Sequence, residues 1–256
     1  MSENPDEVVH TATDKGICTI TLDAPHNRNA LSRQLVGEFA AALDAAIADD
    51  AVRAIVLTHT GGTFCAGADL SEASSDSKKA APVNLPDILR RIIEAPKPVI
   101  ARLDGHVRAG GTGIVGACDI VISSDKGTFA FSESLLGLAP AVISLTTIPR
   151  MTSRATNRYF LTGEVFDAKT AERIGLITTA ADDLDAELDA LTAQLRKASP
   201  QGLRESKKLQ SAQMLAGFDE NADKLTELSM NLFATEEAHE GMRSFLERRP
   251  ARWATD

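Results

Sequence analysis

The feature that most constrains the fold is a short apolar segment at 54–58, which a polar turn at 59–62 follows. Its length and lack of alternation predict a strand buried on both faces, as in parallel sheets covered by helices. Ser32 is a candidate cap for a helix with apolar residues at helical spacing, and 85–94 predicts a second helix. The alternation of strands and helices predicts the α/β class. Further strands are predicted at 8–13, 17–22, 99–103, 120–123 and 127–131.

The last third of the chain is predicted to be helical. From residue 153 onward the apolar residues have helical spacing, with a weak strand signal at 175–177, whereas the composition of 71–84 predicts a surface loop. We therefore predict a core domain over 1–199 and a C-terminal helical region over 200–256. An apolar stripe in that region should bury against the core or against a neighbouring subunit. The stripe consists of Leu225, Leu228, Leu232, Phe233 and Phe245.

Charge and composition argue against several classes of protein. The chain of 256 residues carries 27 basic and 36 acidic residues, which gives a net charge of −9. An acidic surface repels phosphate groups, so neither nucleic acid nor an anionic membrane is expected as a partner. No apolar run reaches the roughly 20 residues of a membrane-spanning helix, and the polar N-terminus at 1–7 does not resemble a signal peptide. Three separated cysteines, Cys18, Cys65 and Cys118, fit a reducing cytoplasm.

Three common kinds of catalytic site find little support. The histidines show neither the i, i+4 spacing nor the pairing with cysteine that zinc sites use, so no metal is expected. No serine lies in a G-x-S-x-G nucleophile elbow. Gly111, Gly113 and Gly116 match the dinucleotide pattern G-x-G-x-x-G, with Glu133 about twenty residues further on. We set this match aside because residues 104–109 separate it from the preceding predicted strand.

Two glycine-containing segments indicate a different kind of site. Residues 64–70 follow the buried strand at 54–58, and their small side chains leave backbone N–H groups accessible to a ligand. Gly110 and Gly111 open a predicted helix, where unpaired N–H groups favour negative charge. Two such donors aimed at one oxygen would form an oxyanion hole. Two unrelated turns that require glycine would produce the same pattern.

Residues 64–70, 105–119 and 131–140 together resemble the crotonase superfamily, the enoyl-CoA hydratase/isomerase proteins. The resemblance covers nearly the whole chain and implies a spiral of ββα units, followed by a C-terminal helical region that forms trimers, often paired into hexamers. It also implies an acyl-CoA thioester substrate, with coenzyme A as part of the substrate and no separate cofactor. The run at 140–144 is similar to the bacterial methylglutaconyl-CoA hydratase-like branch.

The same resemblance assigns catalytic roles to Ala68, Gly110 and Glu133. The N–H groups of Ala68 and Gly110 would hold the thioester oxygen, on which negative charge grows in an enolate-like state. Glu133 matches the family's second catalytic glutamate and would transfer protons at the acyl chain. The first glutamate of the family's hydratases stands three residues after the second oxyanion donor, where this chain has Gly113. We therefore expect an enoyl-CoA hydratase, with an isomerase that uses Glu133 alone, or a weakly catalytic acyl-CoA-binding relative, as alternatives.

Residues that contact coenzyme A are also implied by the resemblance. Arg28 would meet a phosphate or the ribose, and the Ala66 backbone would accept a hydrogen bond from the adenine. Arg108 precedes the Ala109–Gly110 pair. It would either bind a carboxylate on the acyl group or form a salt bridge with a neighbouring loop. The remaining implied coenzyme A contacts are Ala30, Asp69 and Leu70.

Overall fold

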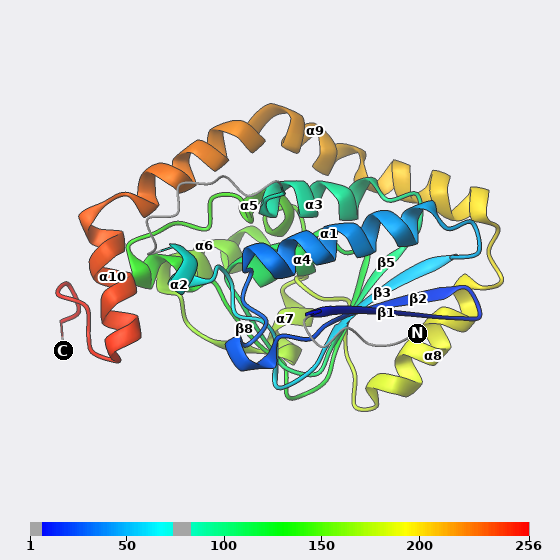
Figure 1. Ribbon diagram of the computed structural model, residues 1–256, viewed down its shortest axis with the longest axis horizontal. Helices are drawn as coiled ribbons and strands as arrows, with labels where there is room; N and C mark the ends of the chain where they lie inside the picture. Colours follow the sequence, from blue (N-terminus) through cyan, green and yellow to red (C-terminus); the bar gives the residue numbers. More distant parts are fainter. Residues whose placement is uncertain (1–6, 74–82, 256) are drawn as a thin grey trace.

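Two β-sheets form the centre of the molecule (Figure 1). The computed structural model describes residues 7–73 and 83–255. The larger sheet has six strands in the order β1-β2-β3-β5-β7-β10, and the smaller sheet has four in the order β4-β6-β8-β9. The larger sheet contains β1 (Val9–Asp14), β2 (Ile17–Leu22), β3 (Ala54–His59), β5 (Val99–Leu103), β7 (Ile120–Ser123) and β10 (Thr179–Ala180). The smaller sheet contains β4 (Thr63–Cys65), β6 (His106–Arg108), β8 (Thr128–Ala130) and β9 (Phe166–Asp167).

The chain passes from the larger sheet to the smaller one three times. In each pass a parallel strand of the larger sheet (β3, β5 or β7) is followed by a parallel strand of the smaller sheet (β4, β6 or β8). Helices α3 (Leu85–Glu94) and α4 (Gly110–Ala117) lead back to the larger sheet after the first two passes. This arrangement confirms the α/β class and the predicted spiral of ββα units. Its effect is to bring the residues after β4, β6 and β8 together at one end of the smaller sheet.

The helices begin where the sequence supplies caps. The Ser32 side chain accepts a hydrogen bond from the Leu35 N–H (3.2 Å) at the start of α1 (Arg33–Ala48). Asn84 and Asp87 form a capping box at the start of α3. Both helices bury an apolar face, Leu35, Val36 and Phe39 among the buried residues of α1. The remaining elements are η1 (Pro25–Asn27), α2 (Leu70–Ala73), η2 (Ser132–Leu136), α5 (Ser144–Thr147), α6 (Ser153–Thr162), α7 (Ala168–Arg173) and α8 (Leu184–Leu195).

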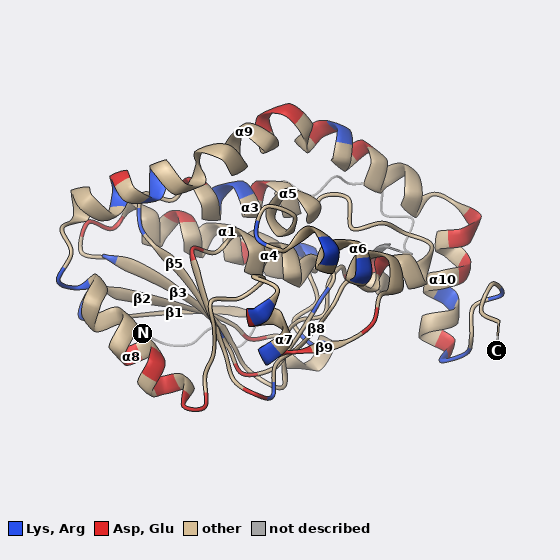
Figure 2. Ribbon diagram, turned by 180° about the vertical axis from the view of Figure 1, so that it is seen from behind, with Lys and Arg blue, Asp and Glu red and all other residues tan. Residues whose placement is uncertain are grey.

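Two helices form the end of the chain, α9 (Pro200–Phe233) and α10 (Glu236–Glu247). Figure 1 shows α9 arching over α3, and Figure 2 shows charged residues along its outer face. The predicted apolar stripe is only partly buried: Leu225 packs against the main core, but Leu228 is 43% exposed and Phe245 57% exposed. The domain division at 199/200 stays a prediction. Within the described residues, we find no helix with the length and apolar character needed to cross a membrane.

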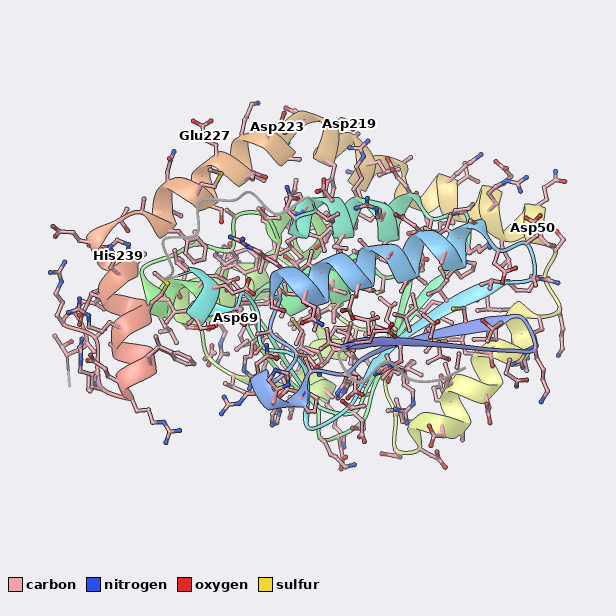
Figure 3. All side chains as sticks on the ribbon, viewed as in Figure 1. Asp50, Asp69, Asp219, Asp223, Glu227 and His239 are labelled. Atoms are coloured by element: carbon pink, nitrogen blue, oxygen red, sulfur yellow. The ribbon has the colours of Figure 1, made fainter. Side chains whose placement is uncertain are left out.

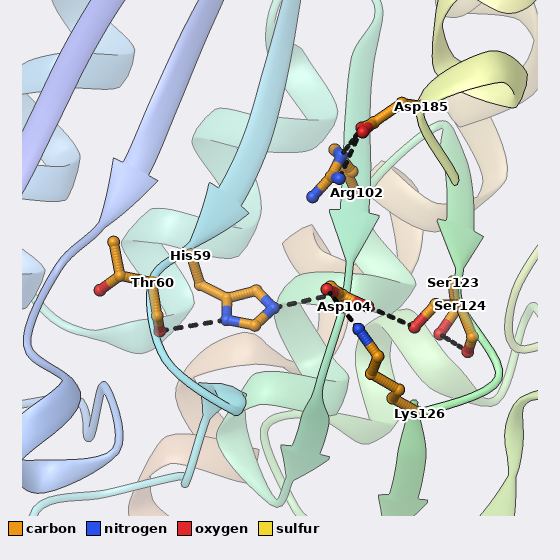
Figure 4. A network of polar contacts seen from close by, with 8 residues as sticks. All are labelled: His59, Thr60, Arg102, Asp104, Ser123, Ser124, Lys126 and Asp185. Carbon is orange, nitrogen blue, oxygen red and sulfur yellow. Dashed lines mark hydrogen bonds and ion pairs between the residues drawn. The ribbon is translucent and has the colours of Figure 1, made fainter. Parts of the chain in front are cut away.

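A polar network holds the corners where the chain leaves the larger sheet (Figure 4). The Asp104 N–H donates to His59 Nε2 (3.1 Å), so Nδ1 carries the ring proton and donates to the Thr60 carbonyl oxygen (3.2 Å). Ser124 Oγ and Lys126 Nζ contact the Asp104 carboxylate at 2.7 and 3.1 Å. Burial lowers the pKa of His59, which favours the neutral ring that this bonding requires. The network thus links the three segments that follow β3, β5 and β7, which lead into the strands of the smaller sheet.

Several sequence-based expectations need correction. The strand expected at 175–177 is absent, and the pairing with β7 falls on Thr179–Ala180 instead. The loop expected at 71–84 begins with the end of α2, and residues 74–82 lie outside the described part. Residues 104–109 are not a loop between strand and helix, because they contain β6, which turns into α4 through Ala109 alone. The short strands β4, β6 and β9 carry too few residues for periodicity to reveal them.

Candidate active site

A cavity of about 650 Å³ lies where the ends of β4, β6 and β8 meet the C-terminal helices. Three sequence-predicted catalytic residues line it together: Ala68 after β4, Gly110 at the start of α4 and Glu133 in η2. The sheet topology explains this meeting, because β4, β6 and β8 are parallel neighbours and their carboxyl ends lie at one edge. The other walls come from the segment around Ile143, from α9 and from α10.

The backbone N–H groups of Ala68 and Gly110 are available to a ligand. Neither N–H donates a hydrogen bond within the described residues. The peptide groups just before them are paired: the Gly67 carbonyl oxygen accepts from the Leu31 N–H (2.8 Å), and the Ala109 N–H donates to the Ala130 carbonyl oxygen (3.1 Å). Gly110 is the first residue of α4, where N–H groups have no partner within the helix. Donors at a helix start favour an oxygen that carries negative charge.

The two donors are brought together by an unusual backbone. Ala109 has φ 45°, a conformation that costs about 1–3 kcal/mol for a residue other than glycine. Gly67 has φ +93°, and a Cβ at this position would lie 2.8 Å from the Ala109 Cβ and 3.6 Å from the Gly110 nitrogen. Only glycine therefore allows the loop after β4 to approach the start of α4 this closely. The strain is local to the predicted oxyanion hole.

Glu133 is a buried carboxyl group without a partner for one of its oxygens. Glu133 is 9% exposed, and its Oε2 atom has no hydrogen-bond partner within the described residues. Burial raises the pKa of Glu133 from 4.5 to about 7. A carboxyl group with such a pKa can both take and give a proton near neutral pH, as a general acid–base catalyst must.

The same burial predicts how stability depends on pH. Because the folded-state pKa of Glu133 lies above its ordinary value, folding binds a proton between pH 4.5 and about 7, and stability falls as the pH rises through this range. Glu133→Gln removes this loss. At about 1.36 kcal/mol per pKa unit, we expect the variant to be about 3 kcal/mol more stable than the wild type at pH 8, and equally stable near pH 4. Urea unfolding at both pH values measures this difference; an equal difference at both pH values would contradict the burial of an ionising carboxyl group.

Gly113 is a buried residue of α4 that leaves no room for a side chain. A Cβ at Gly113 would lie 2.6 Å from Ile143 Cγ2 and 3.0 Å from Ile143 Cβ. Its backbone does not have positive φ, so the close approach of Ile143 is what requires glycine here. The Ile143 side chain therefore packs on the backbone of α4 at Gly113, the position where the resemblance expects the first glutamate of a hydratase.

The residues implied to bind coenzyme A fall into two groups. Arg28, Ala66 and Leu70 line the cavity, and the Ala66 N–H donates to the Arg28 carbonyl (3.1 Å). Ala30 and Asp69 do not line it. Ala30 is buried, while Asp69 lies at the start of α2 (Figure 3), where burial raises its pKa but hydrogen bonds from Ser71, Glu72 and Asn27 lower it by more. The coenzyme A roles of all five residues remain predictions.

Arg108 lines the cavity without forming the salt bridge that the sequence left open. No carboxylate of the described residues lies within salt-bridge distance of it. Its Nη1 donates to the carbonyl oxygens of Val107 (2.9 Å) and Thr128 (2.6 Å), and its Nη2 donates to Thr128 Oγ1 (2.9 Å). It does contact a neighbouring strand, β8, but through neutral groups. Burial lowers the pKa of Arg108, although an arginine stays charged at neutral pH.

Sequence reasoning missed the residues that close the cavity from the C-terminal side. Met230 and Phe233 of α9 and Phe245 of α10 line it together with Val142 and Ile143. The apolar stripe of the tail was visible in the sequence for Phe233 and Phe245. The surface that this stripe covers could not be predicted, because periodicity shows which face of a helix is apolar but not what that face packs against.

Comparisons with known proteins support the fold and identify the family. Residues 12–256 match the sequence profile of the enoyl-CoA hydratase/isomerase family. A crystal structure of an enoyl-CoA hydratase from Mycobacterium avium is 47% identical with a TM-score of 0.89, covering 97% of this chain and 100% of that chain. The 2,3-dehydroadipyl-CoA hydratase of Escherichia coli is 29% identical, covering 91% of this chain and 93% of the relative. The trans-2-decenoyl-acyl-carrier-protein isomerase of Streptococcus mutans is also 29% identical, covering 92% and 94%.

The fold and the site together define an enzyme of the crotonase superfamily. The chain belongs to the enoyl-CoA hydratase/isomerase family. This confirms the family, the fold and an enoyl-CoA hydratase-like activity on an acyl-CoA substrate, as predicted from the sequence. The assignment to the methylglutaconyl-CoA branch stays a prediction.

Proposed function

We propose that the protein is an enoyl-CoA hydratase-like enzyme that works through a thioester enolate held by the N–H groups of Ala68 and Gly110. The observation that carries the proposal is the meeting of these two unpaired donors with the buried carboxyl group of Glu133 in one cavity. Donors fixed in advance stabilise an oxygen on which charge develops, and each typically contributes about 3–4 kcal/mol.

In the proposed hydration, Glu133 transfers the proton. The Glu133 carboxylate takes a proton from water as the water oxygen bonds to C3 of the 2-enoyl thioester. The electrons of the C2–C3 double bond move to the thioester oxygen, which Ala68 and Gly110 hold as an enolate. Glu133 then returns a proton to C2, which gives the 3-hydroxyacyl thioester and restores the carboxylate. The raised pKa of Glu133, about 7, suits a group that must act in both directions.

One observation favours double-bond isomerisation as a second candidate. Gly113 faces Ile143, so no second carboxylate stands at the position that orients water in the family's hydratases. Isomerisation needs one proton carrier: Glu133 takes a proton from C2 of a 3-enoyl thioester, and the resulting dienolate accepts it at C4. The product is the 2-enoyl thioester, with no net gain or loss of atoms.

The experiment that tests the proposal follows three substrates with the purified protein. Crotonyl-CoA and methylglutaconyl-CoA report hydration through loss of the conjugated double bond, and 3-hexenoyl-CoA reports isomerisation through its formation. Turnover of either kind supports enolate chemistry, and the ratio of the two rates separates the candidates. Binding of all three thioesters without turnover would instead support the acyl-CoA-binding alternative.

The contact between Gly113 and Ile143 allows a paired test of the missing glutamate. Gly113→Glu alone should lower the melting temperature and the activity, because its Cβ would overlap Ile143 Cγ2. Gly113→Glu combined with Ile143→Gly removes that overlap and adds a carboxylate. We expect the double variant to hydrate crotonyl-CoA faster, relative to its rate of isomerisation, than Ile143→Gly alone. An unchanged ratio in a folded double variant would mean that a carboxylate at 113 does not orient the water.

The proposal includes no cofactor apart from the coenzyme A of the substrate, a cytoplasmic location, and a trimer or hexamer. The exposed apolar residues Leu228 and Phe245 support assembly, since a second copy would bury them. Light scattering at micromolar concentration measures the oligomeric state, and a monomer would contradict this expectation.

A further inference from the structure

Arg108 is a charged residue of the cavity wall that the proposed proton transfer does not use. It lies on β6, two residues before Gly110, and is half-buried. Its guanidinium group has five N–H donors. Three of them are used, two by Nη1 and one by Nη2. The Nε–H and the second Nη2–H have no acceptor within the described residues. The guanidinium group also has no carboxylate partner among these residues.

The bonds to Thr128 leave one edge of the guanidinium group free. Nη1 and Nη2 donate to the carbonyl oxygen and the hydroxyl of the same residue, as the end-on fork of an arginine does. His106 Nδ1 also contacts Thr128 Oγ1 (2.8 Å), which fixes this anchor further. The remaining Nε–H and Nη2–H share the other edge, where an arginine binds both oxygens of a carboxylate.

The position of the anchor indicates which part of the ligand Arg108 meets. β6 lies between β4, which leads to the Ala66 side of the cavity, and β8, which leads to η2 and Glu133. The guanidinium group bonds to β8 and not to β4, and Arg108 is in register with Ala130, three residues before Glu133. It therefore stands on the side of the predicted proton carrier rather than on the side of Arg28 and Ala66, where coenzyme A is expected.

We infer that the substrate is an enoyl-CoA whose acyl chain carries a carboxylate, and that Arg108 binds this carboxylate through its free edge. The inference rests on the proposed function for the orientation of the thioester. It makes Arg108 a specificity-determining residue, because an uncharged acyl chain would leave its guanidinium group without a ligand partner in a mainly apolar cavity.

The test measures binding, so that it does not depend on turnover. Titration calorimetry compares glutaryl-CoA with pentanoyl-CoA and adipoyl-CoA with hexanoyl-CoA, pairs that differ mainly in the terminal carboxylate. The wild type should bind the carboxylated member about 10- to 100-fold more tightly in at least one pair. The monomethyl ester of that acid should bind like the uncharged member. Equal binding within both pairs would overturn the inference.

Two variants assign the preference to Arg108. Arg108→Gln should remove the preference, because the carboxylated thioesters bind less tightly and the uncharged ones bind at least as tightly as to the wild type, while the affinity for free coenzyme A stays unchanged. Arg108→Lys, which keeps the charge but not the two-pronged geometry, should retain part of it. Arg173→Gln on α7 is the control, and should change nothing, because Arg173 contacts Thr170 at the surface. If Arg108→Gln weakens free coenzyme A as much as the acids, Arg108 binds a phosphate and the inference fails.

A further comparison separates failure of this inference from failure of the proposed function. A preference for the carboxylated thioesters without turnover of any enoyl-CoA would contradict the proposed function but leave the carboxylate site intact. Turnover of crotonyl-CoA without any preference for the carboxylated thioesters would support the proposed function and overturn the inference about Arg108. For a variant that unfolds, the ester comparison in the wild type alone still decides the inference.

Discussion

Glu133→Gln is expected to lower the turnover of an enoyl-CoA by about 10²–10⁴-fold while leaving its dissociation constant nearly unchanged. Glutamine keeps the shape and polarity of the side chain but cannot take up a proton. The thioester is held by backbone groups of Ala68 and Gly110, which the substitution does not touch. Steady-state rates and calorimetry with a saturated acyl-CoA measure the two quantities separately.

The matched control is Glu187→Gln on α8, a half-buried glutamate outside the cavity, which should keep the wild-type rate. Loss of activity through misfolding is not expected for Glu133→Gln, since the variant should be more stable than the wild type at pH 8. If Glu133→Gln retains most of the wild-type rate, the proton comes from another group and the assignment of Glu133 is wrong.

Gly67→Ala should lower the rate by about 10²–10³-fold, the usual effect of losing one oxyanion donor. The added Cβ would meet the Ala109 Cβ at 2.8 Å, and φ +93° is a strained conformation for alanine. The loop must therefore move away from the start of α4, which separates the N–H groups of Ala68 and Gly110. The effect should fall on kcat, because the enolate gains more from these donors than the bound thioester does.

Gly62→Ala is a control on the other side of β4, in the turn between β3 and β4. Its Cβ would meet no atom within 4 Å, and its φ is not positive. We expect a rate close to the wild type for this variant. A similar loss for Gly62→Ala and Gly67→Ala would mean that neither segment beside β4 tolerates alanine, and the alignment of the two donors would then not explain the result.

The sequence predicts the larger sheet better than the smaller one. The strands at 17–22, 99–103 and 120–123 and the helix at 85–94 appear with the bounds that their apolar patterns predict. The strands of the smaller sheet are two or three residues long, and their place is set by contacts between distant segments rather than by local pattern. This is why β6, which lies within residues 104–109, cannot be predicted from the local pattern.

The sequence allowed a prediction of the two backbone donors and the carboxyl group of the candidate site. Ala68, Gly110 and Glu133 come from separate segments, and the resemblance to a family, not periodicity, brought them together. The contact between Gly113 and Ile143 could not be predicted, since one side chain joins α4 to the residue before α5, thirty residues further along the chain. Nor could the anchoring of Arg108 on Thr128, because the register of β6 and β8 decides it.

A crystal structure of the Glu133→Gln variant with a bound enoyl-CoA tests the central claim most directly. The account predicts the thioester oxygen about 2.7–3.1 Å from the backbone nitrogens of both Ala68 and Gly110, with the side chain at 133 facing C2 and C3 of the acyl chain. A thioester oxygen bound by other groups, or an acyl chain that lies away from residue 133, would contradict the account.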